Sequence, residues 1–379
     1  GDVAKILIDA KATIDVLDDD ERTPLAYAAS GGHLEITKAL IAANASLDIT
    51  DRSDRTALDW AIEAEHSEIE NLLVVEDTAR KTAALHKAAD EGDVEELKHL
   101  VADGSLSLEA KNAEDLTPLM QTVIKGHMDA AKILLRARAR LEATSKGGLT
   151  PLLHAAKQGQ AKVVQVLINS KASLEATDAM GFSPLLMAAW RGDAQTTEAL
   201  LAAKASLDAK DHNMQTALDW AINKGHANLV KMLNVESRLR KVDALHAAAR
   251  DGDITSIESL LASNVHVEVR DIHGLTPLMQ AASNGEANAT KVLIEADAQV
   301  EAPDRDTWAP LLYAARYGHE KCAQVLIDAK ATVDVKDDYD GMTALMLAVT
   351  HGHTGVTKVL LAANASIEAK DRKNRTSFN

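Results

Sequence analysis

The most regular feature of the chain is a short pattern of apolar and small residues that recurs along almost its whole length. A tetrad that begins with Thr or Ser and continues with Pro or Ala and then Leu is followed by small residues and, about nine positions on, by Gly. Successive copies are 33 or 34 residues apart, except for two gaps of 27. A period of this length indicates an array of repeated units. The first residue of the tetrad falls at Thr23, Thr56, Ala83, Thr117, Thr150, Ser183, Thr216, Asp243, Thr276, Ala309, Thr343 and Thr376.

Within each unit, the pattern predicts a helix, a tight turn, a second helix and an extended connection. In residues 276–304, Thr276 can cap the first helix, and Pro277 stands in its first turn, where a missing N–H costs nothing. Gly285 is placed to end that helix, and residues 292–294 form the apolar stripe of the second helix. Helices this short are marginal alone, so we expect each to pack on its neighbours.

This pattern resembles the ankyrin repeat, and the resemblance covers essentially the whole chain. The resemblance implies an all-α fold: an ankyrin-repeat solenoid of stacked helix-turn-helix units, with β-hairpin fingers along one edge of a curved superhelix. The residues that carry it are Thr-Pro-Leu at 23–25, 117–119 and 276–278, Ala-Leu-His at 84–86 and 244–246, and Gly-His from 32, 126, 225, 318 and 352.

One position departs from the family pattern. Ankyrin repeats usually have Gly after the second helix, where the backbone is left-handed, but only Gly104 follows that rule here. A side chain in this conformation costs roughly 1 kcal/mol, so we expect Lys171→Gly and Lys204→Gly to raise the midpoint of thermal unfolding. The other residues at this position are Lys11, Asn44, Arg138, Asp297, Asn264, Lys330 and Asn364.

The two short gaps indicate a second, longer period. Each follows a copy of the heptapeptide TALDWAI, at 56–62 and 216–222, and Thr56, Thr216 and Thr376 are each 160 residues apart. We therefore predict three blocks of repeats. They are the end of a first block (1–78), a complete five-repeat block (79–238) and a second five-repeat block truncated in its last repeat (239–379). Partial units at both ends predict a section of a longer array.

The search for chemistry favours structural roles. TALDWAI could be a catalytic motif in duplicate, but Asp59 and Asp219 fall in the first turn of a helix, where a carboxylate caps well. The chain has no nucleotide-binding loop and no zinc-protease motif. Cys322 is the only cysteine and is expected to be a buried thiol, and the His-Gly-His tract at 351–353 is a weak metal candidate. We expect no catalytic, cofactor or metal site.

Charge and composition restrict the partners and the location. The formal net charge of −16 disfavours nucleic acid and anionic membrane surfaces and favours basic or neutral proteins as partners, and the chain could form part of a larger assembly. No apolar run reaches the length needed to span a membrane, which predicts no membrane insertion. A single cysteine fits a reducing compartment, which predicts an intracellular, cytoplasmic protein.

The resemblance also implies where a partner would bind. In ankyrin-like arrays, partners contact the finger tips and the end of the first helix on the concave side, and Trp, Tyr and Arg often dominate interface energy. Phe182 and Trp308 could instead pack finger on finger. The candidate contact residues at these places are Met180, Phe182, Trp190, Arg191, His212, Met214, His273, Arg305, Trp308, Arg316, Tyr317 and Tyr339.

Other recurring residues are expected to be structural. Tyr27, Trp60, Trp220 and Tyr313 share one position in the first helix and are expected to pack between units. The basic pairs 80–81 and 240–241 could bind a partner or pair with the acidic residues Glu76 and Glu236.

Three functions remain open from the sequence. The favoured one is a non-catalytic scaffold that binds a partner protein along the concave face and finger tips. The alternatives are a regulatory ankyrin stalk of a larger protein whose catalytic or channel domain lies outside this segment, and a structural subunit of a large assembly.

Overall fold

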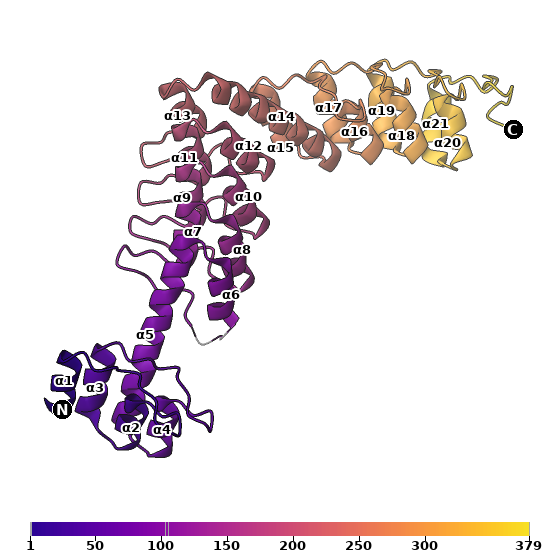
Figure 1. Ribbon diagram of the computed structural model, residues 1–379. Coiled ribbons are helices and arrows are strands. Elements are labelled where there is room, and N and C mark those ends of the chain that lie inside the picture. The colour runs from indigo at the N-terminus through magenta and orange to yellow at the C-terminus, as the bar shows by residue number, and fades with distance from the viewer. Residues whose placement is uncertain (1, 103, 105, 379) are drawn as a thin grey trace. The chain divides into compact units, whose positions relative to one another are not determined.

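The computed structural model describes residues 2–102, 104 and 106–378, and within them it contains twenty-one α-helices (Figure 1). The chain forms two compact units, Gly1–Val230 and Lys231–Asn379. The boundary between these units falls inside α14 (Ala227–Asp251).

The helices of the first unit are α1 (Asp2–Asp9), α2 (Pro24–Ser30), α3 (Leu34–Ala42), α4 (Ala57–Glu63), α5 (Ser67–Glu91), α6 (Val94–Ala102), α7 (Pro118–Lys125), α8 (Met128–Arg136), α9 (Pro151–Gln158), α10 (Ala161–Asn169), α11 (Pro184–Arg191), α12 (Ala194–Ala202) and α13 (Ala217–Asn223). Those of the second unit, after α14, are α15 (Ile254–Ala262), α16 (Pro277–Asn284), α17 (Ala287–Glu295), α18 (Pro310–Tyr317), α19 (Glu320–Asp328), α20 (Ala344–Thr350) and α21 (Thr354–Ala362).

In each compact unit, the helices form two rows. In the first unit α7, α9, α11 and α13 contact one another in order, and α6, α8, α10 and α12 form the second row behind them (Figure 1). In the second unit α16, α18 and α20 form the first row, and α15, α17, α19 and α21 form the second. Most first helices also pack on the second helix that follows, as α7 does on α8 and α16 does on α17. The predicted all-α solenoid of helix pairs is therefore confirmed.

The first helices begin and end where the sequence pattern predicts. In α9, the hydroxyl of Thr150 accepts a hydrogen bond from the Leu153 N–H at 3.3 Å, and Pro151 occupies the first turn. Gly159 ends the helix in the left-handed conformation, with a φ of 71°. The same Thr or Ser cap begins most of the other first helices.

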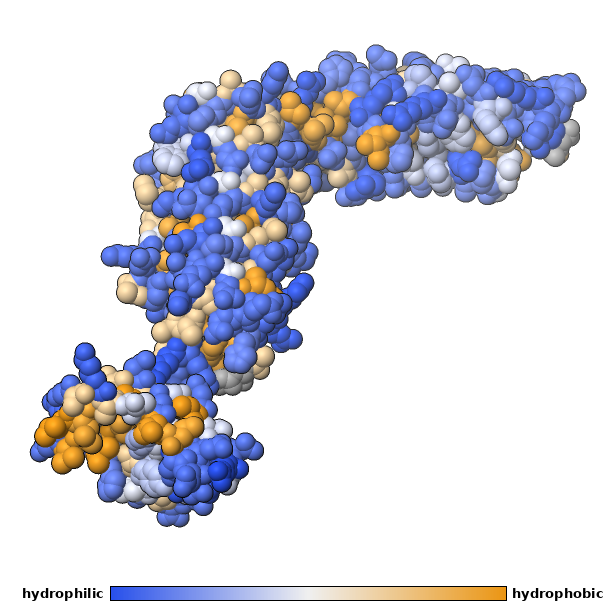
Figure 2. Space-filling view, in the orientation of Figure 1, coloured by the Kyte–Doolittle hydropathy of each residue, from blue (hydrophilic) through white to orange (hydrophobic). Residues whose placement is uncertain are grey.

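The core consists of small and aliphatic side chains. In α11, Leu185, Leu186, Ala188 and Ala189 are all fully buried, and the short side chains of the alanines let neighbouring helices approach closely. Hydrophobic side chains also gather at the surface over α1 and α3 (Figure 2), where Val3 is 71% exposed.

The second helices end in the left-handed turn that the sequence predicts. Lys171 has a φ of 73°, and its N–H donates to the Ile168 carbonyl while the Ala172 N–H donates to Leu167. This is the Schellman arrangement, which satisfies the last carbonyls of a helix. The ten predicted positions all have a φ between 61° and 73°.

The short units lack the predicted extended connection to the next unit. In these two units, which are 27 residues long instead of 33, the second helix continues directly into the first helix of the next unit. The resulting continuous helices, α5 and α14, each have 25 residues. In α5, Ile69 and Leu73 are buried near one end and Leu85 and Ala88 near the other, with no buried residue between them. The predicted block limits, 78/79 and 238/239, fall inside these helices, so the division into blocks stays a prediction.

The fingers are tight loops rather than β-hairpins. Within the described residues, their only β-pairing is an isolated bridge between Lys336 and Thr343. Most fingers are closed instead by an acidic or polar side chain that accepts hydrogen bonds from backbone N–H groups of its own tip, as Asp51 does from Ser53 and Arg55. Donors taken up in this way cannot also form a ladder between the two arms of the loop.

Candidate interaction groove

The repeated heptapeptide TALDWAI starts a helix. The hydroxyl of Thr56 accepts from the Asp59 N–H at 3.2 Å, and the Asp59 carboxylate accepts from the Thr56 N–H at 2.8 Å. Thr216 and Asp219 form the same capping box, and hydrogen bonds from the backbone and hydroxyl of Thr216 lower the pKa of Asp219. The predicted capping role of both aspartates is confirmed.

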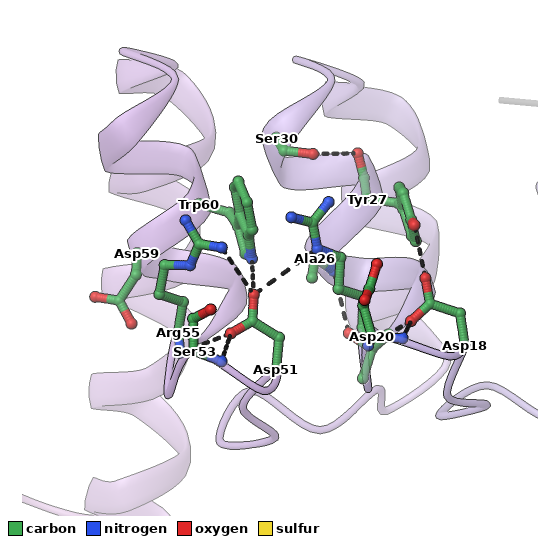
Figure 3. A network of polar contacts seen from close by, with 12 residues as sticks. Asp18, Asp20, Ala26, Tyr27, Ser30, Asp51, Ser53, Arg55, Asp59 and Trp60 are labelled. Carbon is green, nitrogen blue, oxygen red and sulfur yellow. Dashed lines mark hydrogen bonds and ion pairs between the residues drawn. The ribbon is translucent and has the colours of Figure 1, made fainter.

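The tryptophan of this heptapeptide lies in a polar network with a finger aspartate (Figure 3). Oδ2 of Asp51 accepts a hydrogen bond from Nε1 of Trp60 at 3.0 Å and lies 3.3 Å from Nη2 of Arg55. The guanidinium carbons of Arg22 and Arg55 lie 3.8 and 3.7 Å from the centre of the Trp60 ring. Trp60 therefore packs between two repeats and also binds the finger carboxylate.

The same contact recurs along the chain. A side chain nine residues after the finger aspartate donates to Oδ2 of that aspartate, so the finger and the following helix are held together in one repeat. Besides Trp60 with Asp51, the pairs are Tyr27 with Asp18, Trp220 with Asp211, Gln280 with Asp271 and Tyr313 with Asp304.

Five of the predicted contact residues line one groove in the second compact unit. Arg305 and Trp308 come from one finger, Arg316 and Tyr317 from the end of α18, and Tyr339 from the next finger. The groove has a volume of about 750 Å³. It is also lined by Asp304, Asp306, Thr307, Tyr313, Asp337, Asp338, Asp340, Met342 and Leu347.

Aromatic rings form much of this groove. The rings of Trp308 and Tyr313 are 5.3 Å apart, and the Arg316 guanidinium lies 5.5 Å from the centre of the Trp308 ring. Burial and the hydrogen bond that it donates to Asp304 raise the pKa of Tyr313, so this phenol stays protonated. Tyr339 is 82% exposed. Exposed aromatic and arginine side chains in one concave site are typical of a protein-binding surface.

The other seven predicted contact residues lie outside the groove. Met180, Met214, His212 and His273 are exposed at finger tips. Trp190 and Arg191 lie at the end of α11, where Trp190 is 41% exposed and the Lys224 ammonium lies 5.4 Å from the centre of its ring. Phe182 is only 6% exposed and packs on Trp220 with ring centres 5.4 Å apart. Phe182 therefore packs on a helix of the next repeat and is not an exposed contact residue.

The basic junction residues form structural contacts. Nε of Arg80 pairs with Glu76 at 2.7 Å, and its other nitrogens donate to the carbonyls of Ile41 and Ala45 at the end of α3. Arg240 pairs with Glu236 at the same distance of 2.7 Å. The expected pairing with the two glutamates is confirmed.

The remaining candidate chemical groups are engaged in the fold. Nε2 of His353 is 2.8 Å from the Arg316 carbonyl, and Nδ1 of His351 is 2.9 Å from the Leu347 carbonyl. Cys322 is buried as predicted, and burial raises the pKa of its thiol. Across residues 2–102, 104 and 106–378, no group of three or more His, Cys, Asp or Glu side chains is placed to hold a metal ion. In the same residues, no helix is both long and apolar enough to cross a membrane.

Stacked pairs of short helices with a finger between successive pairs define a helical-repeat solenoid. The chain belongs to the ankyrin-repeat family. A family model of three ankyrin repeats matches residues 1–84, 85–178, 245–337 and 302–371, and a model of a single ankyrin repeat matches residues 180–212. A comparison with curated proteins gave no match. Ankyrin repeats are in general protein–protein interaction modules and are typically non-catalytic.

Sequence reasoning missed the acidic part of the groove. It assigned Tyr313 to packing and did not consider Asp337, Asp338 or Asp340. A signal was present, because an aspartate stands before most tetrads and a side chain that can donate often follows nine residues later. The finger of Asp337 is one residue longer, and the equivalent helix residue, ten positions on, is Leu347.

Proposed function

We propose that this protein is a non-catalytic, cytoplasmic scaffold that binds a basic or neutral partner protein along its concave face and finger tips. The convergence of Arg305, Trp308, Arg316, Tyr317 and Tyr339 on one groove is the observation that carries this proposal. These residues were chosen by their offset from the tetrad alone, and side chains of these types supply most of the binding energy at many interfaces.

The charge of the groove supports a basic partner. Five aspartates and two arginines line it, which gives a formal net charge of −3. A partner with positive side chains at the matching positions would be attracted before contact and held after it.

Site-specific photo-crosslinking tests the proposal. A benzophenone amino acid replaces Tyr339 in the groove or, as the control, Leu361 on α21 in the second-helix row, where the side chain is 41% exposed. Irradiation of native cells should give one dominant protein adduct from position 339, identified by mass spectrometry. The double variant Trp308→Ala/Tyr317→Ala should lose that adduct. Adducts only from position 361 would favour a structural subunit that binds through its second helices.

A further inference from the structure

One buried carboxylate in the groove has an oxygen that the fold leaves unused. Asp337 is only 4% exposed, and its Oδ1 accepts hydrogen bonds from the backbone N–H groups of Asp340 and Gly341, both at 2.8 Å, and of Met342 at 3.4 Å. Oδ2 of Asp337 has no hydrogen-bond or ion-pair partner among the described residues. Oδ2 is not fully buried, so it is open to the groove, where a ligand that supplies a donor can reach it.

The other repeats show which partner is missing. In five fingers, Oδ2 accepts a hydrogen bond from the residue nine positions on. The finger of Asp337 is one residue longer, since its N–H reaches the carbonyl of Met342, five residues on, where the Asp51 N–H reaches Arg55, four residues on. The equivalent helix position is therefore Leu347, which is buried, lines the groove and has no donor.

Two other fingers show which chemistry fits such an oxygen. Nη2 of Arg55 lies 3.3 Å from Oδ2 of Asp51, and Nε of Arg375 lies 2.7 Å from Oδ2 of Asp371. At Asp51, the same guanidinium also stacks on an aromatic ring. In the finger of Asp337, the residue at the place of these arginines is Met342, which can do neither.

We propose that the groove takes an arginine side chain of the partner protein, whose guanidinium binds Oδ2 of Asp337 between the rings that line the groove. The planar guanidinium suits this place because it can donate to a carboxylate and stack on aromatic faces at once. The lining favours a cation, because its formal net charge is −3 even with the positive charge of Arg316 included. This inference rests on the proposed function, since it names the group by which the partner is recognised.

The test uses an acetylated and amidated heptapeptide of glycine and serine with one central arginine. Matched peptides carry citrulline, lysine or trimethyllysine at the same place. The chain contains four tryptophans, so a sample labelled with ¹⁵N-tryptophan gives four indole signals, and the Trp308→Phe variant assigns the signal in the groove. The arginine peptide should shift this signal in a saturable way, and citrulline, which is neutral and nearly the same shape, should not.

Two variants separate the unused oxygen from the general charge. Asp337→Asn keeps the oxygen that closes the finger, as Asn112 does for Glu114 and Leu116 in another finger, and should weaken binding at least tenfold. Met342→Arg supplies an internal guanidinium at the place of Arg55 and should also weaken binding at least tenfold.

The controls lie in the first compact unit. Asn213→Arg adds the same charge at an exposed finger tip and should leave binding unchanged. Asp178→Asn should do the same. Asp178 shares the finger position of Asp337, and its Oδ1 likewise accepts from backbone N–H groups, but it is partly exposed and lies outside the aromatic groove.

The outcomes separate this inference from the proposed function. Equal binding of the arginine and citrulline peptides, full binding by Asp337→Asn, or tighter binding of either lysine peptide would overturn the arginine site. If position 339 still crosslinks to a partner in that case, the scaffold function stands. If the arginine peptide binds as expected but crosslinks arise only from position 361, the scaffold function fails and the site stands.

Discussion

In the left-handed turns of this protein, glycine should be more stabilising than alanine in place of lysine, against the usual effect of adding glycine. Lys171 ends α10 with a φ of 73°, and Lys330 ends α19 with a φ of 72°, so each compact unit offers one test. Both side chains are exposed. The change therefore acts mainly on the backbone and removes no core packing.

Three free-energy terms set the size of the effect. A Cβ in this conformation destabilises the folded state by about 1–2 kcal/mol, and glycine, which has no Cβ, avoids this cost. Glycine also makes the unfolded chain more flexible, which costs about 0.4–1 kcal/mol. Loss of the cation at the end of the helix costs about 0.3–1 kcal/mol. The third term is shared by Lys171→Ala, so Lys171→Gly should be more stable than Lys171→Ala by about 0.5–1 kcal/mol.

The comparison is made by calorimetry and urea unfolding. For units of this size, 1 kcal/mol shifts the midpoint by roughly 2–4 °C, so Lys171→Gly should melt about 1–4 °C above Lys171→Ala, with an unchanged urea m-value. Lys330→Gly and Lys330→Ala should repeat the difference. The reverse change, Gly104→Ala, should destabilise the protein, because Gly104 has a left-handed φ of 68°. An added Cβ would meet no atom within 4 Å, so the loss would report the backbone term alone. A glycine variant that melts at or below its alanine partner would refute the reasoning.

Three further predictions concern pH and the continuous helix. Burial, aided by Lys157, lowers the pKa of His154 to about 4, so the unfolded chain protonates first. Stability should then fall by up to roughly 3 kcal/mol between pH 6.5 and 4. In urea titrations His154→Gln should have a shallower slope over this range, although burial also lowers the pKa of His246; equal slopes would contradict this. Hydrogen bonds from the side chains of Ser256 and Thr255 lower the pKa of Asp253 to about 2. The contribution of this carboxylate to folding stability is full above about pH 4 and is lost as the pH falls through 2. The stability of Asp253→Asn, followed by circular dichroism, should therefore fall less in acid than that of the native protein. Ala79 is exposed in the middle of α5. In urea unfolding, Ala79→Pro should lower the free energy of unfolding by about 3 kcal/mol and Ala79→Gly by about 1 kcal/mol. If neither variant changed it, the helix would be interrupted there.

The local features of each repeat follow from its sequence because they depend on neighbouring residues. Thr150 and Pro151 start a helix, Gly159 ends it, and the apolar stripe determines which face is buried. The left-handed turn at Lys171 was also predictable, since the period fixes the position and lysine merely tolerates it.

The continuous helices were not predictable by the same reasoning. The two gaps of 27 residues are six residues shorter than a normal unit, which is about the length of a finger connection. This difference indicates that a finger is absent but does not indicate what replaces it. Residues 75–81 contain no Gly or Pro, so nothing there stops a helix. Comparison with normal units favoured a boundary at Ala83, and the local propensity of the junction prevailed over that comparison.

The groove was predictable in its exposed residues and not in its acidic ones. Family offsets identify Trp308 and Tyr317 because finger tips and helix ends are exposed in every repeat. The role of Asp337 depends on which atoms surround its carboxylate, and that depends on the one-residue insertion in its finger. Neither the insertion nor Leu347 alone changes the repeat pattern enough to indicate a site.

In an array of repeats, a binding site can arise from the loss of one internal contact. The finger aspartate is retained at Asp337 because Oδ1 still closes the loop, so the fold keeps the carboxylate whether or not Oδ2 is used. Replacement of the helix donor by Leu347, and of the finger arginine by Met342, removes both of the internal partners seen at Asp51. The unused oxygen is then left to accept a charge-assisted hydrogen bond from a ligand that supplies a guanidinium. A partner selected in this way would depend on a single arginine, and its affinity for Asp337→Asn would fall even though every other contact on the finger face was unchanged.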